Sequence, residues 1–208
     1  MGTMDTTDTM EPTIKLLSFS IVSIVNLYLG RQEKMFDHHS DHVSEHNGER
    51  RLKVVVFGSY HSGKTSLVRA INPSLRGTEA RSGEGSTTVA FDLGIREHRG
   101  YKIYFYGTPG QERFEEAREV VAFGLHIGLV LADATRGMTV FEQRVLADLK
   151  ASGIPCIVLA SKADLPGASP DFVRKGAGEG ATVLAVSAAT GAGIDALLDR
   201  IVEIAASL

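Results

Sequence analysis

The sequence is poor in cysteine and has no excess of positive charge, and both shortages restrict its function. Cys156 is the only cysteine among 208 residues and lies in an apolar run that predicts a buried strand. A disulfide framework is therefore excluded, and a reducing, cytoplasmic compartment is expected. From residue 51 onward there are 18 Lys and Arg against 17 Asp and Glu. Because such a domain has no basic excess, we expect no nucleic-acid partner, and local geometry would have to hold a phosphate-rich ligand.

The sequence also lacks an apolar run long enough for a transmembrane helix. The best candidate, residues 14–29, is interrupted by Lys15 and several polar residues, and it is shorter than the ~20 residues that a spanning helix needs. Asp5, Asp8 and Glu11 precede it, where a signal peptide would have a basic region. We therefore expect residues 1–50 to form an N-terminal extension. Two interpretations stay open: a disordered or artefactually translated extension, or a segment in which residues 14–29 weakly contact the inner membrane surface or bind a partner.

From Arg51 the chain alternates short apolar runs with amphipathic stretches, which is typical of strands joined by crossover helices. We predict one α/β domain, residues 51–208, built as a three-layer sandwich. Its six-stranded sheet is mostly parallel with one antiparallel edge strand, and about five helices flank it. The predicted strands are Leu52–Phe57, Thr88–Arg96, Tyr101–Tyr106, Ile127–Ala132, Ile154–Ala160 and Thr182–Val186. The predicted helices are Lys64–Ile71, Glu112–Ala122, Val140–Ala151, Pro170–Gly176 and Ile194–Ala206.

A glycine-rich loop joins the first predicted strand to the first predicted helix. It contains the phosphate-binding pattern G-x-x-x-x-G-K-[ST] in the strand, loop and helix context that this pattern requires. Gly58 and Gly63 let the backbone turn close to the phosphates, Lys64 adds a positive charge there, and the Thr65 hydroxyl can bind Mg²⁺. The predicted phosphate-binding residues are Gly58, Ser59, Tyr60, His61, Ser62, Gly63, Lys64, Thr65 and Ser66.

A second motif indicates which base the nucleotide carries. Ser161-Lys162-Ala163-Asp164 follows an apolar strand, at the carboxyl end where open α/β sheets bind ligands. The Asp164 carboxylate can accept hydrogen bonds from N1–H and the N2 amino group of guanine, which adenine does not present together. Lys162 would lie along the base, and a backbone N–H of Ser187 or Ala188 would reach guanine O6. The sequence therefore favours GTP and GDP over ATP.

In their order and spacing, these motifs resemble those of the Ras-like small GTPases across residues 51–208. The resemblance rests on Gly58–Thr65, Thr88, Gly110-Gln111, Ser161–Asp164 and Ser187-Ala188. It implies that Thr88, rather than Thr87, senses Mg²⁺ and the γ-phosphate, and that the Gly110 N–H does so from a second switch. It further implies that Gln111 orients the attacking water, with Lys64 and Thr88 as the other catalytic residues.

Two residues depart from the pattern of that family. The third motif reads Gly107-Thr108-Pro109-Gly110-Gln111, where the family usually begins with the Asp that holds Mg²⁺ through a water molecule. This variant resembles a prokaryotic branch of the family, and it predicts weaker Mg²⁺ binding and slower hydrolysis. Ser161 stands where Asn usually ties the base loop to the phosphate loop. The shorter side chain predicts weaker nucleotide binding with guanine selectivity retained.

Taken together, the motifs predict a GTP-binding switch that slowly hydrolyses GTP to GDP and phosphate. The resemblance implies Mg²⁺ as cofactor, and effector, GTPase-activating and exchange proteins as partners. A pseudo-GTPase scaffold that holds nucleotide with little turnover is the alternative that Gly107 raises. A small-molecule kinase is the weakest alternative, because no lid segment with paired arginines is evident.

Overall fold

The structure, a computed structural model, describes residues 44–46, 49–72, 92–108 and 122–208. Residues 14–29, Thr88, Gly110 and Gln111 lie outside these ranges, as does the predicted helix Glu112–Ala122 except for its last residue. The predictions made for them are therefore not tested by the geometry. No helix in the described ranges is long and apolar enough to cross a membrane.

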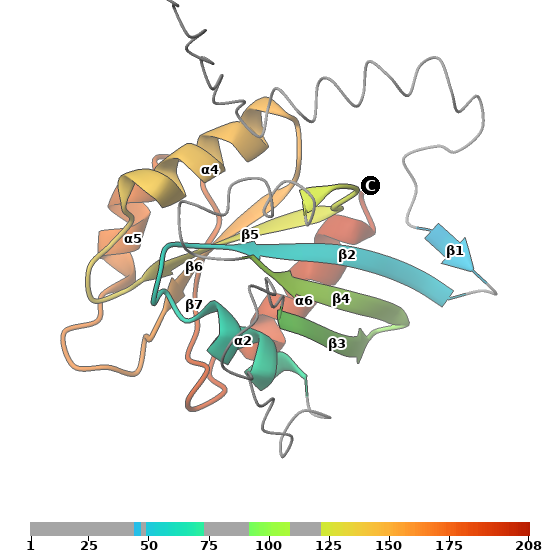
Figure 1. Cartoon of the computed structure of the whole chain (residues 1–208), viewed down its shortest axis with the longest axis horizontal. Helices are drawn as coiled ribbons and strands as arrows, with labels where there is room; N and C mark the ends of the chain where they lie inside the picture. Colours follow the sequence, from blue (N-terminus) through green and yellow to red (C-terminus); the bar gives the residue numbers. More distant parts are fainter. Residues whose placement is uncertain (1–43, 47–48, 73–91, 109–121) are drawn as a thin grey trace, which may run out of the picture.

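A central, mostly parallel sheet organises the described chain, as the sequence predicts (Figure 1). Its strands follow the order β3-β4-β2-β5-β6-β7, and the only antiparallel pair along this path is β3 with β4, at one edge. The strands are β1 (Ser44–His46), β2 (Glu49–Phe57), β3 (Asp92–His98), β4 (Tyr101–Gly107), β5 (Ile127–Asp133), β6 (Cys156–Ser161) and β7 (Val183–Ala185).

The short strand β1 was not predicted from the sequence. It pairs antiparallel with the beginning of β2, Ser44 opposite Arg51. Both β1 and the first two residues of β2 precede Arg51, where the sequence analysis begins the domain. The sheet therefore reaches into the segment that was expected to be an extension.

Four described helices cover the two faces of the sheet, which confirms the three-layer arrangement. One apolar cluster lies under α2 and α6, and the second lies under α4 and α5 on the opposite face. The central strand β5 is buried along its first six residues, whereas β4 alternates between buried and half-buried positions. The helices are α2 (Lys64–Ile71), α4 (Val140–Ala151), α5 (Pro170–Ala177) and α6 (Ile194–Ala205).

Strand β6 begins two residues later than predicted because the preceding residues close helix α4. Gly153 has a φ of 67°, in the left-handed region that glycine adopts freely, and the Ile154 N–H donates to the Leu149 carbonyl at 3.0 Å. The chain therefore reaches the sheet only at Cys156.

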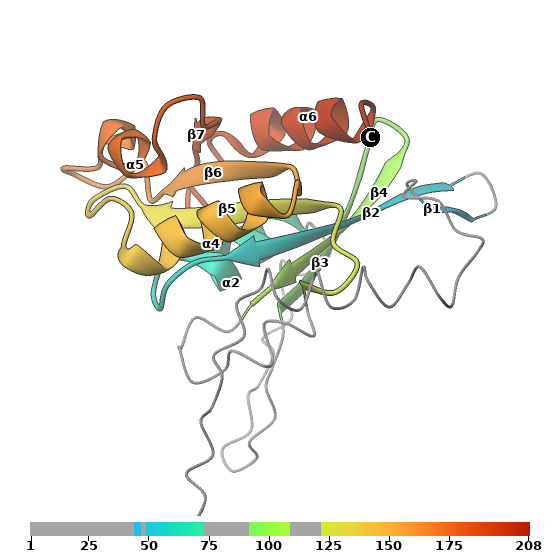
Figure 2. The ribbon, with the colours of Figure 1, turned by 90° about the horizontal axis from the view of Figure 1, so that it is seen from above.

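The topology brings three loops to one edge of the sheet. Strands β2, β5 and β6 are parallel neighbours, so their carboxyl ends lie side by side (Figures 1 and 2). Helix α2, which follows β2, covers one face, and α4, which follows β5, covers the other. Loops that leave a sheet toward opposite faces open a crevice between them, which is where α/β proteins bind their ligands.

Candidate nucleotide site

The loop after β2 has two positions that only glycine fills without strain. A Cβ atom on Gly58 would lie 2.5 Å from the Ser62 Oγ and 2.6 Å from the Leu131 carbonyl oxygen. Gly63 precedes the first residue of α2 with a φ of 97°, a conformation that costs other residues free energy. The loop therefore needs glycine at both positions of the phosphate-binding pattern, as the sequence predicts.

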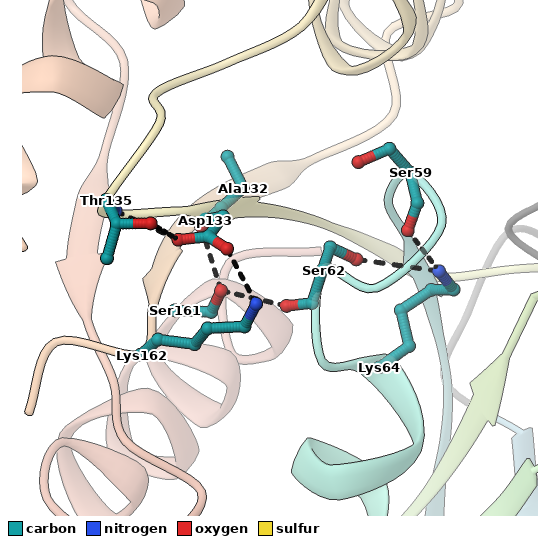
Figure 3. A network of polar contacts seen from close by, with 8 residues as sticks. All are labelled: Ser59, Ser62, Lys64, Ala132, Asp133, Thr135, Ser161 and Lys162. Atoms are coloured by element: carbon teal, nitrogen blue, oxygen red, sulfur yellow. Dashed lines mark hydrogen bonds and ion pairs between the residues drawn. The ribbon is translucent and has the colours of Figure 1, made fainter. Parts of the chain in front are cut away.

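The ammonium group of Lys64 lies inside this loop. It donates to the Gly58 carbonyl at 2.9 Å and to the Ser59 carbonyl at 2.7 Å, and the residue is only 8% exposed (Figure 3). A buried cation attracts an anion more strongly than a solvated one, because less water screens its charge. The structure thus places positive charge within the turn that the motif marks as the phosphate cradle.

The side chains of Tyr60 and His61 point away from the core of the loop. Tyr60 is 61% exposed, His61 is exposed, and their ring centroids lie 3.8 Å apart. His61 has a φ of 63°, so the strained position belongs to the tip of the loop. Only the backbone of these two residues is therefore a candidate for contact with phosphate.

Glu142 is a residue of this site that the sequence analysis missed. It lies in the first turn of α4, is 1% exposed, and its carboxylate accepts a hydrogen bond from the Ser59 N–H at 2.7 Å. The same carboxylate accepts the Thr139 N–H at 2.8 Å, which closes a capping box at the start of the helix. Burial raises the pKa of Glu142, but the hydrogen bonds outweigh it and hold this pKa below its ordinary value. An ionised Glu142 thus joins α4 to the phosphate loop.

The base loop is joined to the phosphate loop by Ser161. Its hydroxyl lies 2.8 Å from the Ser62 carbonyl oxygen and 3.0 Å from that of Ala132, and the side chain is buried (Figure 3). The tie that an Asn makes in the resembling family is therefore present here with a shorter side chain. The expectation that Ser161 weakens nucleotide binding rested on the loss of this tie, and the geometry removes that reason.

An ion pair holds the neighbouring Lys162 in place. Its ammonium group lies 2.6 Å from the Asp133 carboxylate at the end of β5, and Asp133 also accepts the Thr135 N–H at 2.9 Å. Burial raises the pKa of Asp133, but the hydrogen bonds from Lys162 and Thr135 more than offset this and lower it. Lys162 adopts a φ of 56°, a left-handed conformation that a non-glycine residue keeps only when its neighbours hold it.

A pocket connects the two loops. Among the residues that line it are Gly63 from the phosphate loop, Lys162 and Asp164 from the base loop, and Ala188 after β7. Asp164 is exposed. The Ser187 N–H donates to the Ala192 carbonyl at 2.9 Å, so of the two N–H groups predicted for O6 this one already has a partner. The structure therefore brings Gly63 of the predicted phosphate loop and the predicted base residues to one pocket.

Thr65 lies at the end of the site that is predicted to hold Mg²⁺, the metal end, and its contact with Asp92 was not predicted from the sequence. The Thr65 hydroxyl donates a hydrogen bond to the Asp92 carboxylate, and Asp92 lies directly across the β3–β4 pair from Gly107. The neighbouring Thr108 is buried and its hydroxyl donates to the Val56 carbonyl at 2.9 Å. Within the described ranges, no group of three or more His, Cys, Asp and Glu side chains comes together as a metal site.

Comparison with known protein families shows to which family this domain belongs. Residues 49–207 match the family of the elongation factor Tu GTP binding domain. The chain belongs to this family. An uncharacterised protein of Methanocaldococcus jannaschii is 35% identical over 114 residues, which cover 55% of this chain and 71% of that protein. Translation initiation factor IF-2 of Rubrobacter xylanophilus is 35% identical over 169 residues, which cover 76% of this chain and 24% of the factor.

Solved structures show the same fold in other GTP binding domains. The G domain of the T. maritima FeoB iron transporter superposes with a TM-score of 0.58 at 22% identity, covering 74% of this chain and 99% of that one. Aquifex aeolicus Era, bound to GDP and AlF4⁻, gives a TM-score of 0.58 at 23% identity, covering 74% of this chain and 56% of Era. At these identities the likeness establishes the fold.

The family assignment confirms the prediction of a GTP-binding domain. The chain is a GTP-binding P-loop domain whose family members are GTPases. It spans about a quarter of the initiation factor that it resembles. The narrower resemblance to Ras-like small GTPases stays a prediction, as do the individual site residues.

Proposed function

We propose that this GTP binding domain is a molecular switch that binds GTP and GDP and slowly hydrolyses GTP. The observation that carries the proposal is the pocket shared by Gly63, Lys162 and Asp164. It connects the cradle around Lys64 with a carboxylate suited to guanine, at the carboxyl edge of a parallel sheet. The proposal includes switches organised as in Ras-like GTPases, in which Thr88 and Gly110 sense the γ-phosphate.

The phosphate loop and the base loop bind different parts of the nucleotide. The N–H groups at the start of α2 and the ammonium of Lys64 bind the phosphates, and Asp164 accepts guanine N1–H and N2 hydrogens. The ion pair with Asp133 keeps the stem of Lys162 beside the base. Ala188, which lines the pocket, is the better of the two predicted donors to O6, since the N–H of Ser187 is already bonded.

The residues at the metal end fit Mg²⁺. A hydroxyl and a carboxylate are hard oxygen ligands, and Mg²⁺ in nucleotide sites takes one or two such groups beside the phosphates. Thr65 and Thr88 would hold the ion, and the bound ion supplies positive charge that neutralises the phosphate oxygens. Gln111 orients the water that attacks the γ-phosphorus, and GDP leaves with the bridging oxygen.

Regulation would follow the pattern of such switches. Residues 76–88 and 107–123 change conformation between the two nucleotide states, and effector, activating and exchange proteins act on these segments. We place the protein in the cytoplasm, with residues 14–29 as a weak contact to the inner membrane surface.

Nucleotide affinity with and without Mg²⁺ tests the proposal. GDP and GTP should bind the wild-type chain at least ~100-fold more tightly than ATP, because two charge-assisted hydrogen bonds from guanine to Asp164 contribute about 3 kcal/mol or more. Asp164→Ala should remove this preference, and Asp171→Ala, a change at a carboxylate that is 70% exposed on α5, should keep it. Equal affinity of the wild-type chain for ATP and GTP would reject the proposal.

The second candidate is a scaffold that holds GTP without turning it over, and Gly107 is the observation that favours it. Single-turnover hydrolysis with Mg²⁺ separates the two. The switch predicts slow release of phosphate that Gln111→Leu abolishes. A rate in the wild-type chain equal to that of the Gln111→Leu variant would favour the scaffold.

A further inference from the structure

We propose that Asp92 supplies the carboxylate of the Mg²⁺ site that position 107 lacks. The inference rests on the proposed GTP-binding function and concerns which strand provides the metal's acidic ligand, directly or through a water molecule. In the resembling family this carboxylate comes from the strand equivalent to β4. Here β4 ends in Gly107, and the carboxylate comes from β3, the strand beside it.

The strand register places the two positions side by side. β3 and β4 are antiparallel neighbours, and Asp92 is the direct partner of Gly107 at the end of the ladder. Directly opposed residues of an antiparallel pair have Cα atoms only ~4.5–5.5 Å apart and project their side chains to the same face. A carboxylate on residue 92 therefore points to the same side of the sheet as a carboxylate on residue 107 would.

Gly107 leaves the space that Asp92 uses. A Cβ atom on residue 107 would lie 3.1 Å from the Asp92 Cβ and 3.3 Å from its Oδ2. Both separations are closer than ordinary van der Waals contact, and a carboxylate on each residue would add repulsion between like charges. The glycine and the aspartate are thus complementary, and a side chain at position 107 would require Asp92 to shift.

The position of Asp92 relative to α2 supplies the second, independent observation. Its Oδ2 accepts a hydrogen bond from the hydroxyl of Thr65, which is the side chain that the phosphate-binding motif assigns to Mg²⁺. Gly94 explains how the strand comes so close, because a Cβ there would meet the Val68 Cγ1 at 2.9 Å. At Gly94, β3 therefore packs closely against Val68 of α2, and Asp92 reaches Thr65 in the first turn of that helix.

The chemistry of the pair suits a metal ligand set. A hydroxyl has one proton and two lone pairs, so Thr65 can donate to Asp92 while a lone pair stays available to a cation. A carboxylate that accepts the proton of a ligating group orients that group and raises its basicity. The alternative role for Asp92 is purely structural, as a partner for the Thr65 hydroxyl near the positive end of α2, whose first turn has no acidic residue.

Binding of Mn²⁺, measured by electron paramagnetic resonance on the full chain with bound GDP, tests the assignment. Asp92→Asn keeps the size of the side chain and an oxygen for the Thr65 hydroxyl but removes the negative charge. We expect it to weaken Mn²⁺ binding at least ~10-fold, the lower end of the effect of losing an outer-shell partner of a metal ligand. GDP affinity in EDTA should not fall, because the phosphate loop and Asp164 are intact and the change removes a negative charge near the phosphates. Asp171→Asn, the same change at an exposed carboxylate, is the matched control.

The decisive experiment moves the carboxylate from residue 92 to residue 107. Asp92→Gly combined with Gly107→Asp moves the carboxylate back to β4, and we expect it to recover most of the Mn²⁺ affinity that Asp92→Gly alone loses. A purely structural role for Asp92 would instead leave the Mn²⁺ affinity of each folded variant unchanged. Thermal unfolding of each variant shows whether it is folded.

Failure of this inference differs from failure of the proposed function. Wild-type Mn²⁺ affinity in Asp92→Asn would overturn the role of Asp92 and leave GTP binding standing. A wild-type chain that binds no GDP either with Mg²⁺ or in EDTA would overturn the proposed function, and the assignment of Asp92 would fall with it.

Discussion

The two ends of the nucleotide site accommodate a departure from the family pattern in different ways. At the base end, Ser161 replaces an Asn, and its hydroxyl still lies 2.8 Å from the Ser62 carbonyl of the phosphate loop. At the metal end, Gly107 replaces an Asp, and the carboxylate beside Thr65 comes from Asp92 on the neighbouring strand. One change is compensated at the same position, and the other by a residue 15 positions earlier in the chain.

The difference follows from what each contact requires. A hydrogen bond between two loops needs only one donor within reach, and a shorter side chain suffices where the loops already lie close. A glycine has no side chain to contribute, so the missing charge has to come from a neighbouring element. In an antiparallel pair, the directly opposed residue is the nearest neighbour that faces the same side.

The largest effect should come from Glu142, because the phosphate loop is shared by both ends. Glu142→Ala leaves the part-buried N–H groups of Ser59 and Thr139 without their acceptor, and each such loss costs about 1–3 kcal/mol. We expect the free energy of unfolding to fall by about 2–4 kcal/mol on this basis, with weaker binding of GDP in EDTA as well. Chemical denaturation and nucleotide titration measure the two effects.

Glu142→Gln serves as the control for this prediction, because the amide keeps one acceptor oxygen and should lose about half as much stability. Stability of Glu142→Ala equal to that of the wild type would show that the loop is held without α4.

The next prediction concerns Gly107 and Asp92, two residues that are complementary at the metal end. Gly107→Asp alone puts a second carboxylate beside Asp92, where the Cβ would lie 3.1 Å from the Asp92 Cβ. We expect a loss of about 1–3 kcal/mol in unfolding free energy, the usual cost of overpacking, and the exchange with Asp92→Gly should recover it. Additive losses in the double variant, measured by urea denaturation, would contradict the idea that the two positions share one space.

A smaller effect tests the tie at the base end. Ser161→Ala removes the hydrogen bond to the Ser62 carbonyl, and we expect a loss of about 1 kcal/mol, with GDP binding weakened about fivefold. Ser152→Ala is a matched control, since the buried Ser152 hydroxyl has no hydrogen-bond partner. Equal GDP affinity in Ser161→Ala and Ser152→Ala would show that the tie between the loops does not affect the nucleotide.

The smallest expected effect concerns His126. This residue precedes β5 and so lies at the end of the sheet opposite the nucleotide site. The Lys53 N–H donates to His126 Nδ1 at 2.9 Å, and burial, together with the Lys53 charge, lowers the pKa of His126 below its ordinary 6.5. Between 6.5 and the lower folded pKa, the unfolded chain binds a proton that the folded chain does not, so stability is present above pH 6.5 and decreases as the pH falls.

Unfolding free energies of the wild type and of His126→Asn, measured from pH 7.5 to pH 5, should therefore diverge. The loss is at most about 1.4 kcal/mol for each unit by which the pKa is lowered. Asn can accept the Lys53 N–H without titrating, so its pH slope should be flatter. Parallel slopes in the two proteins would show that His126 does not titrate differently on folding.

Local sequence patterns predicted much of the fold. The helices Lys64–Ile71 and Val140–Ala151 begin and end where their apolar spacing predicts, and the sheet is mostly parallel with an antiparallel edge. β1 was missed because a three-residue strand has too few positions to show alternation. The bounds of α5 and β6 moved by one or two residues, because helix ends depend on carbonyl partners outside the local pattern.

The sequence by itself determined the cradle and the base motif of this protein. Gly63 and Lys64 act through the backbone of their own loop, so their spacing predicts their geometry. Only the tertiary structure decided what lies beside them. Glu142 is 83 positions from Ser59, and Asp92 is 27 positions from Thr65. These contacts depend on the register of strands and on which helix covers which face, and a local pattern of residues does not contain that information.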